Sequence, residues 1–217
     1  MPALQAVLWD MDGTLVDSEK VWAEVQLELL AELGATWTLE DCLTLIGSDL
    51  RDAVQVWMAR IPEGVITAEE LADRMFSEVV EALRKEVTFQ PGALELLQAL
   101  RKEDIPCALV SASYRVMIDA VLVHLPPDPF AVIVAGDEVT LGKPNPEPYL
   151  TGAARLGVDP ANCVVIEDSM TGTQAGTAAG MYVVAVPQWV TIPEAPRRLV
   201  VKSLEPLTPE SLRSLLR

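Results

Sequence analysis

Short apolar runs that alternate with helical patterns are the feature that most restricts how this chain can fold. The apolar runs lie at 6–9, 107–110, 131–135, 163–166 and 182–186. Helical patterns separate the later runs, at 91–100, 114–125, 146–156 and 171–179, and a short helix is expected within 203–216. Buried strands that alternate with helices form parallel sheets covered on both faces. We therefore predict an α/β fold with a Rossmann-like core.

The segment from 17 to 86 interrupts this alternation, because it contains no strand-like run. Its apolar residues recur at helical spacing in two stripes, which are Trp22, Val25, Leu29, Leu30 and Leu33, and then Leu71, Met75, Val79 and Leu83. A third helix is expected over 49–60. We therefore predict a helical domain at 17–86, inserted after the first strand of a core made of 1–16 and 87–217.

The charge of the chain restricts its partners. Acidic side chains outnumber basic ones by 32 to 16, which gives a formal net charge of −16 at pH 7. The segment 17–86 carries −10 of this charge, which we interpret as a solvated helix surface. Such a chain repels phosphate backbones and anionic lipids, so we expect neither nucleic acid nor a membrane surface as a partner. The sequence also shows no transmembrane or signal-peptide pattern.

The cysteines and the single histidine narrow the chemistry further. Cys42, Cys107 and Cys163 are odd in number, and two of them lie in strand-like runs, so we expect reduced, buried thiols. His124 lies in an apolar stretch and is expected to be structural, and one histidine excludes a two-histidine metal site. These features predict a cytoplasmic protein, which we expect to be a monomer.

Polar residues follow four of the predicted strands at the point where each strand ends. They are Asp10 and Asp12 after the first, Ser111 after the second, Lys143 within Gly142-Lys143-Pro144 after the third, and Glu167-Asp168 after the fourth. Ligands of open α/β sheets bind at the carboxyl ends of the strands, so these side chains should converge at one edge. Several apolar strands would not all end this way by accident, and we predict a functional site there.

The charges of this group indicate a metal ion. Four carboxylates and one lysine leave a charge of −3, which would repel a phosphate. A divalent cation offsets most of this charge and polarises phosphoryl oxygens. Because the ligands are oxygens, with no histidine or cysteine, they favour Mg²⁺ over zinc. A carboxylate such as Asp10 could then act as a nucleophile, and Asp12 as a general acid and base.

These motifs together resemble the four signature motifs of the haloacid dehalogenase-like superfamily. The matching residues are Asp10-x-Asp12-Gly13-Thr14-Leu15-Val16-Asp17-Ser18, the strand end at Ser111, Gly142-Lys143-Pro144 and Glu167-Asp168-Ser169, in the order and spacing of the family. The helical insert resembles the small α-helical cap of the branch that holds β-phosphoglucomutase and sugar phosphatases. The resemblance extends over nearly the whole chain.

The resemblance implies a role for each of these residues. Asp10 is then the nucleophile and Asp12 the general acid/base, while Ser111 and Lys143 hold the transferring phosphoryl group. The implied Mg²⁺ ligands are Asp10, the main-chain carbonyl of Asp12, and Asp168. Glu167 is implied either as a further ligand or as a neighbour of the metal.

Three functional interpretations remain open at this point. Asp12 argues for phosphate, because the dehalogenases that displace halide lack this acid, and Lys20 and Lys85 do not match the Schiff-base lysine of phosphonate-cleaving relatives. We predict a Mg²⁺-dependent phosphatase acting on a small phosphomonoester, of the sugar-phosphate kind, through an aspartyl-phosphate. The alternative is a β-phosphoglucomutase-like mutase, although Trp22 and Leu50 replace its histidine and arginine. A non-catalytic binding protein is the third reading, which the intact chemical positions disfavour.

Residues beside the expected cleft between cap and core are candidate substrate contacts. They are Trp22, Arg51, Ser113, Tyr114 and Arg115. The indole of Trp22 could cover a sugar face or belong to the cap interior. Arg51 could contact substrate or face solvent, and Arg115 could bind a distal substrate group or pair with surface acids.

Overall fold

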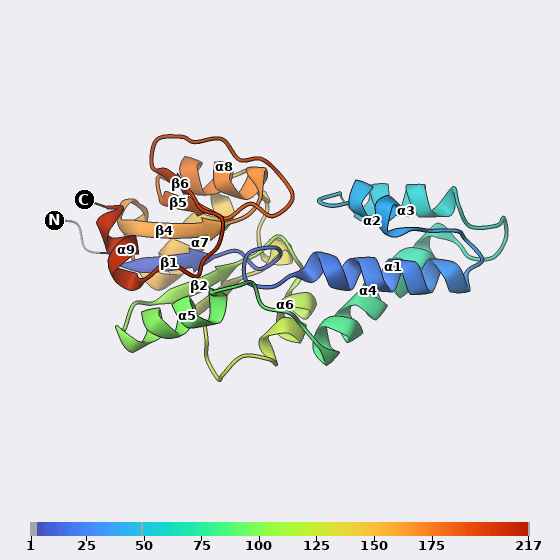
Figure 1. Cartoon of the computed structure of the whole chain (residues 1–217), viewed down its shortest axis with the longest axis horizontal. Coiled ribbons are helices and arrows are strands. Elements are labelled where there is room, and N and C mark those ends of the chain that lie inside the picture. Colours follow the sequence, from blue (N-terminus) through green and yellow to red (C-terminus); the bar gives the residue numbers. More distant parts are fainter. Residues whose placement is uncertain (1–3, 49, 217) are drawn as a thin grey trace. The chain divides into compact units, whose positions relative to one another are not determined.

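The computed structural model describes residues 4–48 and 50–216, and within these ranges a parallel six-stranded sheet forms the centre of the larger part of the chain (Figure 1). The strand order is β3-β2-β1-β4-β5-β6. The strands are β1 Ala6–Trp9, β2 Cys107–Val110, β3 Val132–Val134, β4 Cys163–Glu167, β5 Tyr182–Ala185 and β6 Arg198–Val200. The prediction of an α/β fold with a parallel sheet is therefore confirmed.

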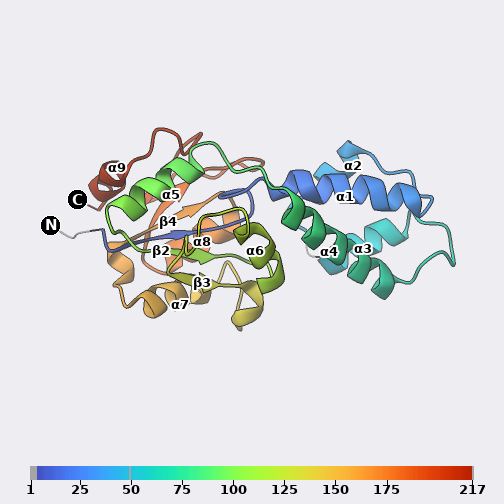
Figure 2. The same cartoon turned by 90° about the horizontal axis from the view of Figure 1, so that it is seen from below.

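Helices cover both faces of this sheet. Those associated with the sheet are α5 Ala93–Lys102, α6 Arg115–Leu122, α7 Glu147–Leu156, α8 Met170–Ala178 and α9 Pro209–Ser214, with 3₁₀ turns η1 Gly136–Glu138 and η2 Pro160–Asn162. Helix α7 packs on β1, β2 and β3, next to α8 on β4 and β5. Figure 2 shows α5 on the opposite face from α7, where α9 packs against α5.

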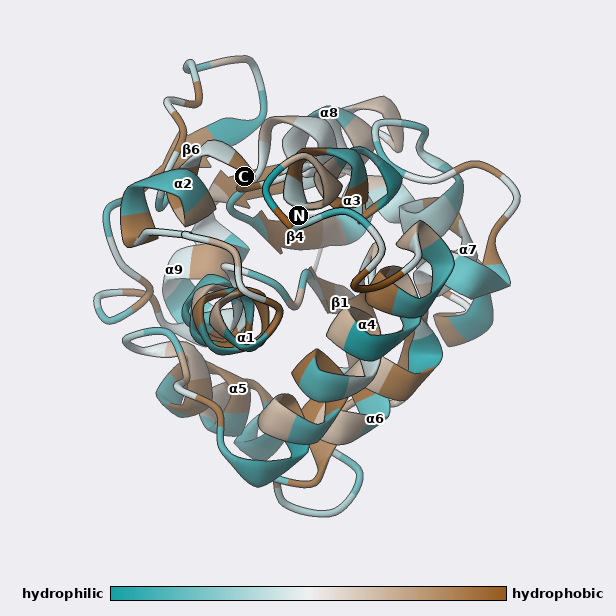
Figure 3. Ribbon diagram, turned by 90° about the vertical axis from the view of Figure 1, so that its right-hand side faces the viewer, coloured by the Kyte–Doolittle hydropathy of each residue, from teal (hydrophilic) through white to brown (hydrophobic). Residues whose placement is uncertain are grey.

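The central strands are mainly apolar because helices bury both of their faces. Every residue of β1, β2 and β4 is buried. The interior between the sheet and helices α7 and α8 includes Leu8, Val110, Tyr149, Val165 and Val183. In Figure 3 the strands β1 and β4 have hydrophobic colours, while the helices carry mixed faces.

The chain divides into two compact units, one made of the residues up to Asp17 and from Thr88 onward, the other of Ser18–Val87. We call the first the core unit and the second the helical unit. The helical unit contains α1 Ser18–Glu32, α2 Leu39–Thr44, α3 Leu50–Met58 and α4 Ala68–Lys85. Both α1 and α3 pack on α4, whose predicted apolar stripe of Leu71, Met75, Val79 and Leu83 is buried.

Capping boxes begin two helices of this unit. Thr38 and Asp41 cap α2, and Thr67 and Glu70 cap α4, each through reciprocal side-chain and backbone hydrogen bonds. Helix α2 is absent from our sequence prediction, because six residues are too few to show a helical period. The predicted start of the third helix, at Asp49, lies outside the described residues. Across the described ranges, no helix has the length and apolar character required to cross a membrane.

Candidate active site

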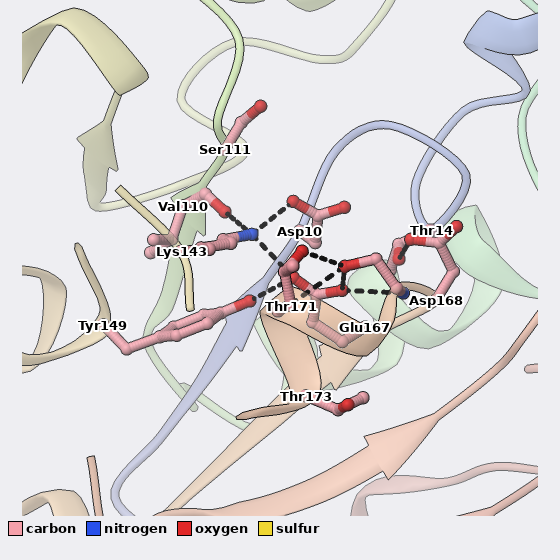
Figure 4. Close-up of polar contacts among 12 residues, drawn as sticks. Asp10, Thr14, Val110, Ser111, Lys143, Tyr149, Glu167, Asp168, Thr171 and Thr173 are labelled. Carbon is pink, nitrogen blue, oxygen red and sulfur yellow. Dashed lines mark hydrogen bonds and ion pairs between the residues drawn. The ribbon is translucent and has the colours of Figure 1, made fainter. Parts of the chain in front are cut away.

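The carboxyl ends of the central strands bring the predicted site residues of the core unit together (Figure 4). Asp10 directly follows β1, Glu167 ends β4 and Asp168 comes next. Lys143, from the loop before α7, reaches across the sheet edge to both strands. Its ammonium nitrogen Nζ lies 2.6 Å from Asp10 Oδ1 and 2.7 Å from Glu167 Oε1. Residues that are 133 and 24 positions apart in the chain therefore form one ionic cluster.

Lys143 uses all of its donor capacity in this cluster. Its third contact is the main-chain carbonyl of Val110, at 2.9 Å, so each ammonium hydrogen has an acceptor. Only 5% of its side chain is exposed. Burial lowers the pKa of Lys143, but the charges of Asp10 and Glu167 raise it, with a net increase. The lysine is therefore held as a buried cation.

Glu167 is fully buried, and both of its carboxylate oxygens accept two hydrogen bonds. Oε1 accepts from Lys143 and from the hydroxyl of Tyr149, at 2.9 Å. Oε2 accepts from the main-chain N–H and the hydroxyl of Ser169, at 3.0 and 2.9 Å. Helix α8 comes so close at Gly172 that a Cβ atom there would lie 1.6 Å from Oε1. The acceptor positions of this carboxylate are thus filled by protein groups.

Burial disfavours the ionised forms of Asp10 and Asp168. Burial, together with the charge of Glu167, raises the pKa of Asp10 well above its usual value. The same two causes raise the pKa of Asp168 to about 7, although a hydrogen bond from Thr14 Oγ1, at 3.2 Å, lowers it. One lysine does not neutralise three neighbouring carboxylates, so this cluster favours a further cation.

The donor set of the cluster fits Mg²⁺. One oxygen from each of Asp10, Glu167 and Asp168 lies within 4.8 Å of the others, and carboxylate oxygens are the groups that hard divalent cations prefer. The turn at Gly13 has a positive φ of 74°, and a Cβ there would lie 2.2 Å from Asp168 Oδ2. Glycine therefore lets the loop after β1 pass directly beside Asp168.

Asp12 faces a different set of partners. Its Oδ2 accepts hydrogen bonds from the hydroxyls of Ser111, at 3.1 Å, and Ser113, at 2.7 Å. The main-chain N–H of Ser113 in turn donates to Ser111 Oγ at 2.9 Å. The other carboxylate oxygen of Asp12, Oδ1, is buried and has no hydrogen-bond partner among the described residues. The two aspartates after β1 are thus separated, one toward the lysine and one toward the serines.

Comparison with known proteins identifies the family. The profile of the haloacid dehalogenase-like hydrolases matches residues 7–186. The chain belongs to this family. Hexitol phosphatase B of Escherichia coli is 32% identical over 184 residues, which cover 84% of this chain and 83% of the relative. Hexitol phosphatase A of the same organism is 36% identical over 211 residues, with coverage of 93% and 92%.

A solved structure supports the same branch of the family. The crystal structure of β-phosphoglucomutase from Clostridium difficile is similar to this haloacid dehalogenase-like hydrolase with a TM-score of 0.76 and 25% identity. The similarity covers 98% of this chain and 97% of that one. The comparisons confirm the predicted branch, and they confirm that the chain is an enzyme, a haloacid dehalogenase-like phosphoric monoester hydrolase.

The predicted substrate contacts are distributed over both units of the hydrolase. Ser113 lies at the carboxyl edge of the sheet, where its hydroxyl donates to Asp12. The guanidinium of Arg115 pairs with Asp119 at 2.8 Å and Glu138 at 3.3 Å. Trp22 is half-buried on α1 and Arg51 is exposed on α3, so both belong to the helical unit. Their roles in substrate binding stay predictions.

Three residues of this site have no role in the sequence prediction, namely Tyr149, Gly172 and Ser169, although Ser169 lies in the fourth motif. Only Tyr149 leaves a usable signal, because it falls on the face of its helix that packs on the sheet. A tyrosine that is buried there needs a partner for its hydroxyl. The identity of that partner depends on tertiary packing, which places the hydroxyl beside Glu167 at the end of β4.

Proposed function

We propose that this haloacid dehalogenase-like hydrolase is a Mg²⁺-dependent phosphatase of small phosphomonoesters, of the sugar-phosphate kind. The observation that carries the proposal is the contact of Lys143 with Asp10, within the carboxylate cluster that includes Asp168. A lysine in that position can bind phosphoryl oxygens next to a nucleophilic carboxylate. The names of the relatives, hexitol phosphatases, support a phosphorylated polyol or sugar as the substrate.

In the proposed first step, a carboxylate oxygen of Asp10 attacks phosphorus, and the bond from phosphorus to the leaving oxygen breaks. Asp12 gives its proton to that oxygen. Because Asp12 Oδ2 is occupied by Ser111 and Ser113, Oδ1 is the atom free to carry the proton. On substrate binding, Ser111 exchanges its contact with Asp12 for a phosphoryl oxygen.

In the second step, water attacks the phosphorus of the aspartyl-phosphate. Asp12 takes the proton from this water, so that Asp10 is released and Asp12 regains its starting state. Lys143 stays charged throughout and offsets the negative charge that develops on the phosphoryl oxygens.

The metal ion has its own place in the proposal. Asp10, Asp168 and the main-chain carbonyl of Asp12 would hold Mg²⁺, which would offset carboxylate charge and polarise the phosphoryl group. Glu167 is predicted as a ligand or a neighbour of the metal. Its filled acceptor positions support the second role, in which it anchors Lys143.

The mutase alternative needs residues that this chain lacks. A mutase must protect its aspartyl-phosphate from water and anchor a second phosphate. At the positions where mutases resembling this chain carry histidine and arginine, it has Trp22 and Leu50. The net charge of −10 over 17–86 also gives a second phosphate little electrostatic support. Hydrolysis is therefore the expected fate of the phosphoryl group.

A phosphate-release assay tests the function. The enzyme is incubated with hexose and hexitol monophosphates in Mg²⁺, and again with excess chelator. We expect phosphate release only with the metal, and full turnover in chelator would refute the metal requirement. With β-glucose 1-phosphate and a trace of the 1,6-bisphosphate, stoichiometric glucose 6-phosphate without free phosphate would establish the mutase instead.

A further inference from the structure

Tyr149 contacts both charged residues at the centre of the site. Its side chain is fully buried on α7, and its hydroxyl donates to Glu167 Oε1 at 2.9 Å. The ammonium of Lys143 lies over its ring, with Nζ 4.9 Å from the ring centroid. Figure 4 shows the tyrosine, the lysine and the glutamate converging on one point below Asp10. Tyr149 therefore contacts Glu167 and also Lys143, the second donor to the same Glu167 oxygen.

The Tyr149 hydroxyl affects where the Lys143 ammonium lies between Asp10 and Glu167. Asp10 and Glu167 compete for the same ammonium, at 2.6 and 2.7 Å. Without the hydroxyl, Lys143 would be the sole donor to Glu167 Oε1 among the described residues, and a fully buried carboxylate has no water to replace the lost bond. The lysine would then be drawn toward Glu167 and away from Asp10.

The surroundings of Glu167 prevent it from adjusting by movement. Ser169 holds its second oxygen through two hydrogen bonds. Gly172 lies so close that not even a methyl group fits between α8 and the carboxylate. Because the glutamate is fixed on these sides, the loss of the Tyr149 hydroxyl has to be compensated by Lys143.

We propose that Tyr149 is a positioning residue, which shares Glu167 with Lys143 and so directs the lysine ammonium toward Asp10. The hydroxyl supplies the competing hydrogen bond, and the ring face supports the cation from the side. Tyr149 itself touches no reacting atom, so it acts through Lys143. This inference rests on the proposed phosphatase function.

The test compares Tyr149→Phe, which removes only the hydroxyl, with Tyr149→Leu, which also removes the ring. Tyr182→Phe is the matched control, because Tyr182 is a half-buried tyrosine of β5 in the same unit, and its ring faces another cation, Arg197. With p-nitrophenyl phosphate and Mg²⁺, we expect Tyr149→Phe to lower kcat by about tenfold, the usual worth of a hydrogen bond to a charged group, with KM nearly unchanged. Tyr149→Leu should lower kcat further, and Tyr182→Phe should leave it unchanged.

A second measurement observes the lysine without relying on turnover. In ¹H–¹⁵N spectra of the metal-free protein, the Lys143 ammonium is assigned by its loss in Lys143→Arg. Its contact with a ring face predicts an upfield proton shift, which Tyr149→Leu removes. In Tyr149→Phe the ring remains, but the signal should move because the ammonium shifts toward Glu167.

The outcomes separate this inference from the function on which it rests. An unchanged kcat in a folded Tyr149→Phe variant would overturn it, as would a kcat loss accompanied by an equal change in KM and a lower melting temperature. If the wild-type enzyme releases no phosphate, the proposed function fails, and the Lys143 signal alone decides the positioning. A signal that is the same in all three Tyr149 forms would then overturn the inference.

Discussion

The core unit and the helical unit bury different kinds of polar group. The core unit buries charge, in Asp10, Glu167 and Lys143, at the ends of its strands. In the described part of the helical unit, the largest buried polar side chain is the neutral Gln26. Its Oε1 accepts hydrogen bonds from the indoles of Trp37 and Trp57, at 3.2 and 3.3 Å.

Buried charge marks the residues to which we assign chemistry, whereas the buried neutral amide serves packing. A buried charge is costly even when paired, because its desolvation offsets much of the attraction. In the core unit, the buried side chains of Asp10, Glu167 and Lys143 bear that cost where the predicted reactive groups gather. The helical unit leaves its charges at the surface, as in the exposed pair of Arg84 and Glu81, and buries a neutral amide that joins two helices and a loop.

Replacement of the predicted nucleophile, in the core unit, should have the largest effect on turnover. Asp10→Asn is expected to abolish turnover, because an amide cannot form the aspartyl-phosphate. Asp12→Asn should slow turnover by about 10²–10⁴-fold, the usual contribution of general acid–base catalysis. Asp73→Asn, on the exposed face of α4, is the control and should be fully active. Steady-state phosphate release measures all three, and near wild-type kcat in Asp10→Asn would refute the covalent mechanism.

Two lysines compare the units directly. Lys143→Ala should reduce kcat by about 10²–10³-fold, because it removes the buried cation that we propose to bind the phosphoryl group. Lys85→Ala, at the exposed end of α4, should leave kcat unchanged. The same assay measures both variants. Equal losses would show that burial of charge does not mark the catalytic residues.

A methyl group added to α8 should affect kcat next to Glu167 but not one turn later, within the same unit. Gly172→Ala places a Cβ atom against Glu167, and the displaced carboxylate should lower kcat by about tenfold through its lost hydrogen bonds. Gly176→Ala adds the same group one turn later, where it meets Val183 and Val165 methyls at 3.1 and 3.2 Å. This control should retain kcat. Similar kcat values in both variants would contradict the anchoring role of Glu167.

The smallest effect on turnover is expected in the helical unit. Gln26→Leu leaves two buried indole N–H groups without their acceptor, at a cost of about 1–3 kcal/mol for each unsatisfied group. Urea unfolding should show this loss, while turnover per folded molecule stays unchanged. Gln55→Leu, exposed on α3, is the matched control. A stability equal to that of the control would mean that the amide does not join the helices.

Prediction from the sequence succeeds where neighbours along the chain decide the structure. Strands β1 and β2 have the predicted bounds, and β3, β4 and β5 differ by one or two residues. Strand β6 escaped prediction, because it has three half-buried residues and begins with Arg198. Its backbone pairs with β5 at the sheet edge, and that pairing depends on a strand distant in the sequence.

The site shows the same boundary between local and distant causes. Alternating apolar runs and the polar residues after them determined, by themselves, a parallel sheet with Asp10, Lys143 and Asp168 at one edge, since parallel strands end together. The tertiary structure alone decided that Asp12 turns to the serines and that Glu167 is saturated by Tyr149 and Ser169. Hydrogen-bond partners are chosen by which side chains packing brings within about 3 Å, and sequence spacing does not encode that distance.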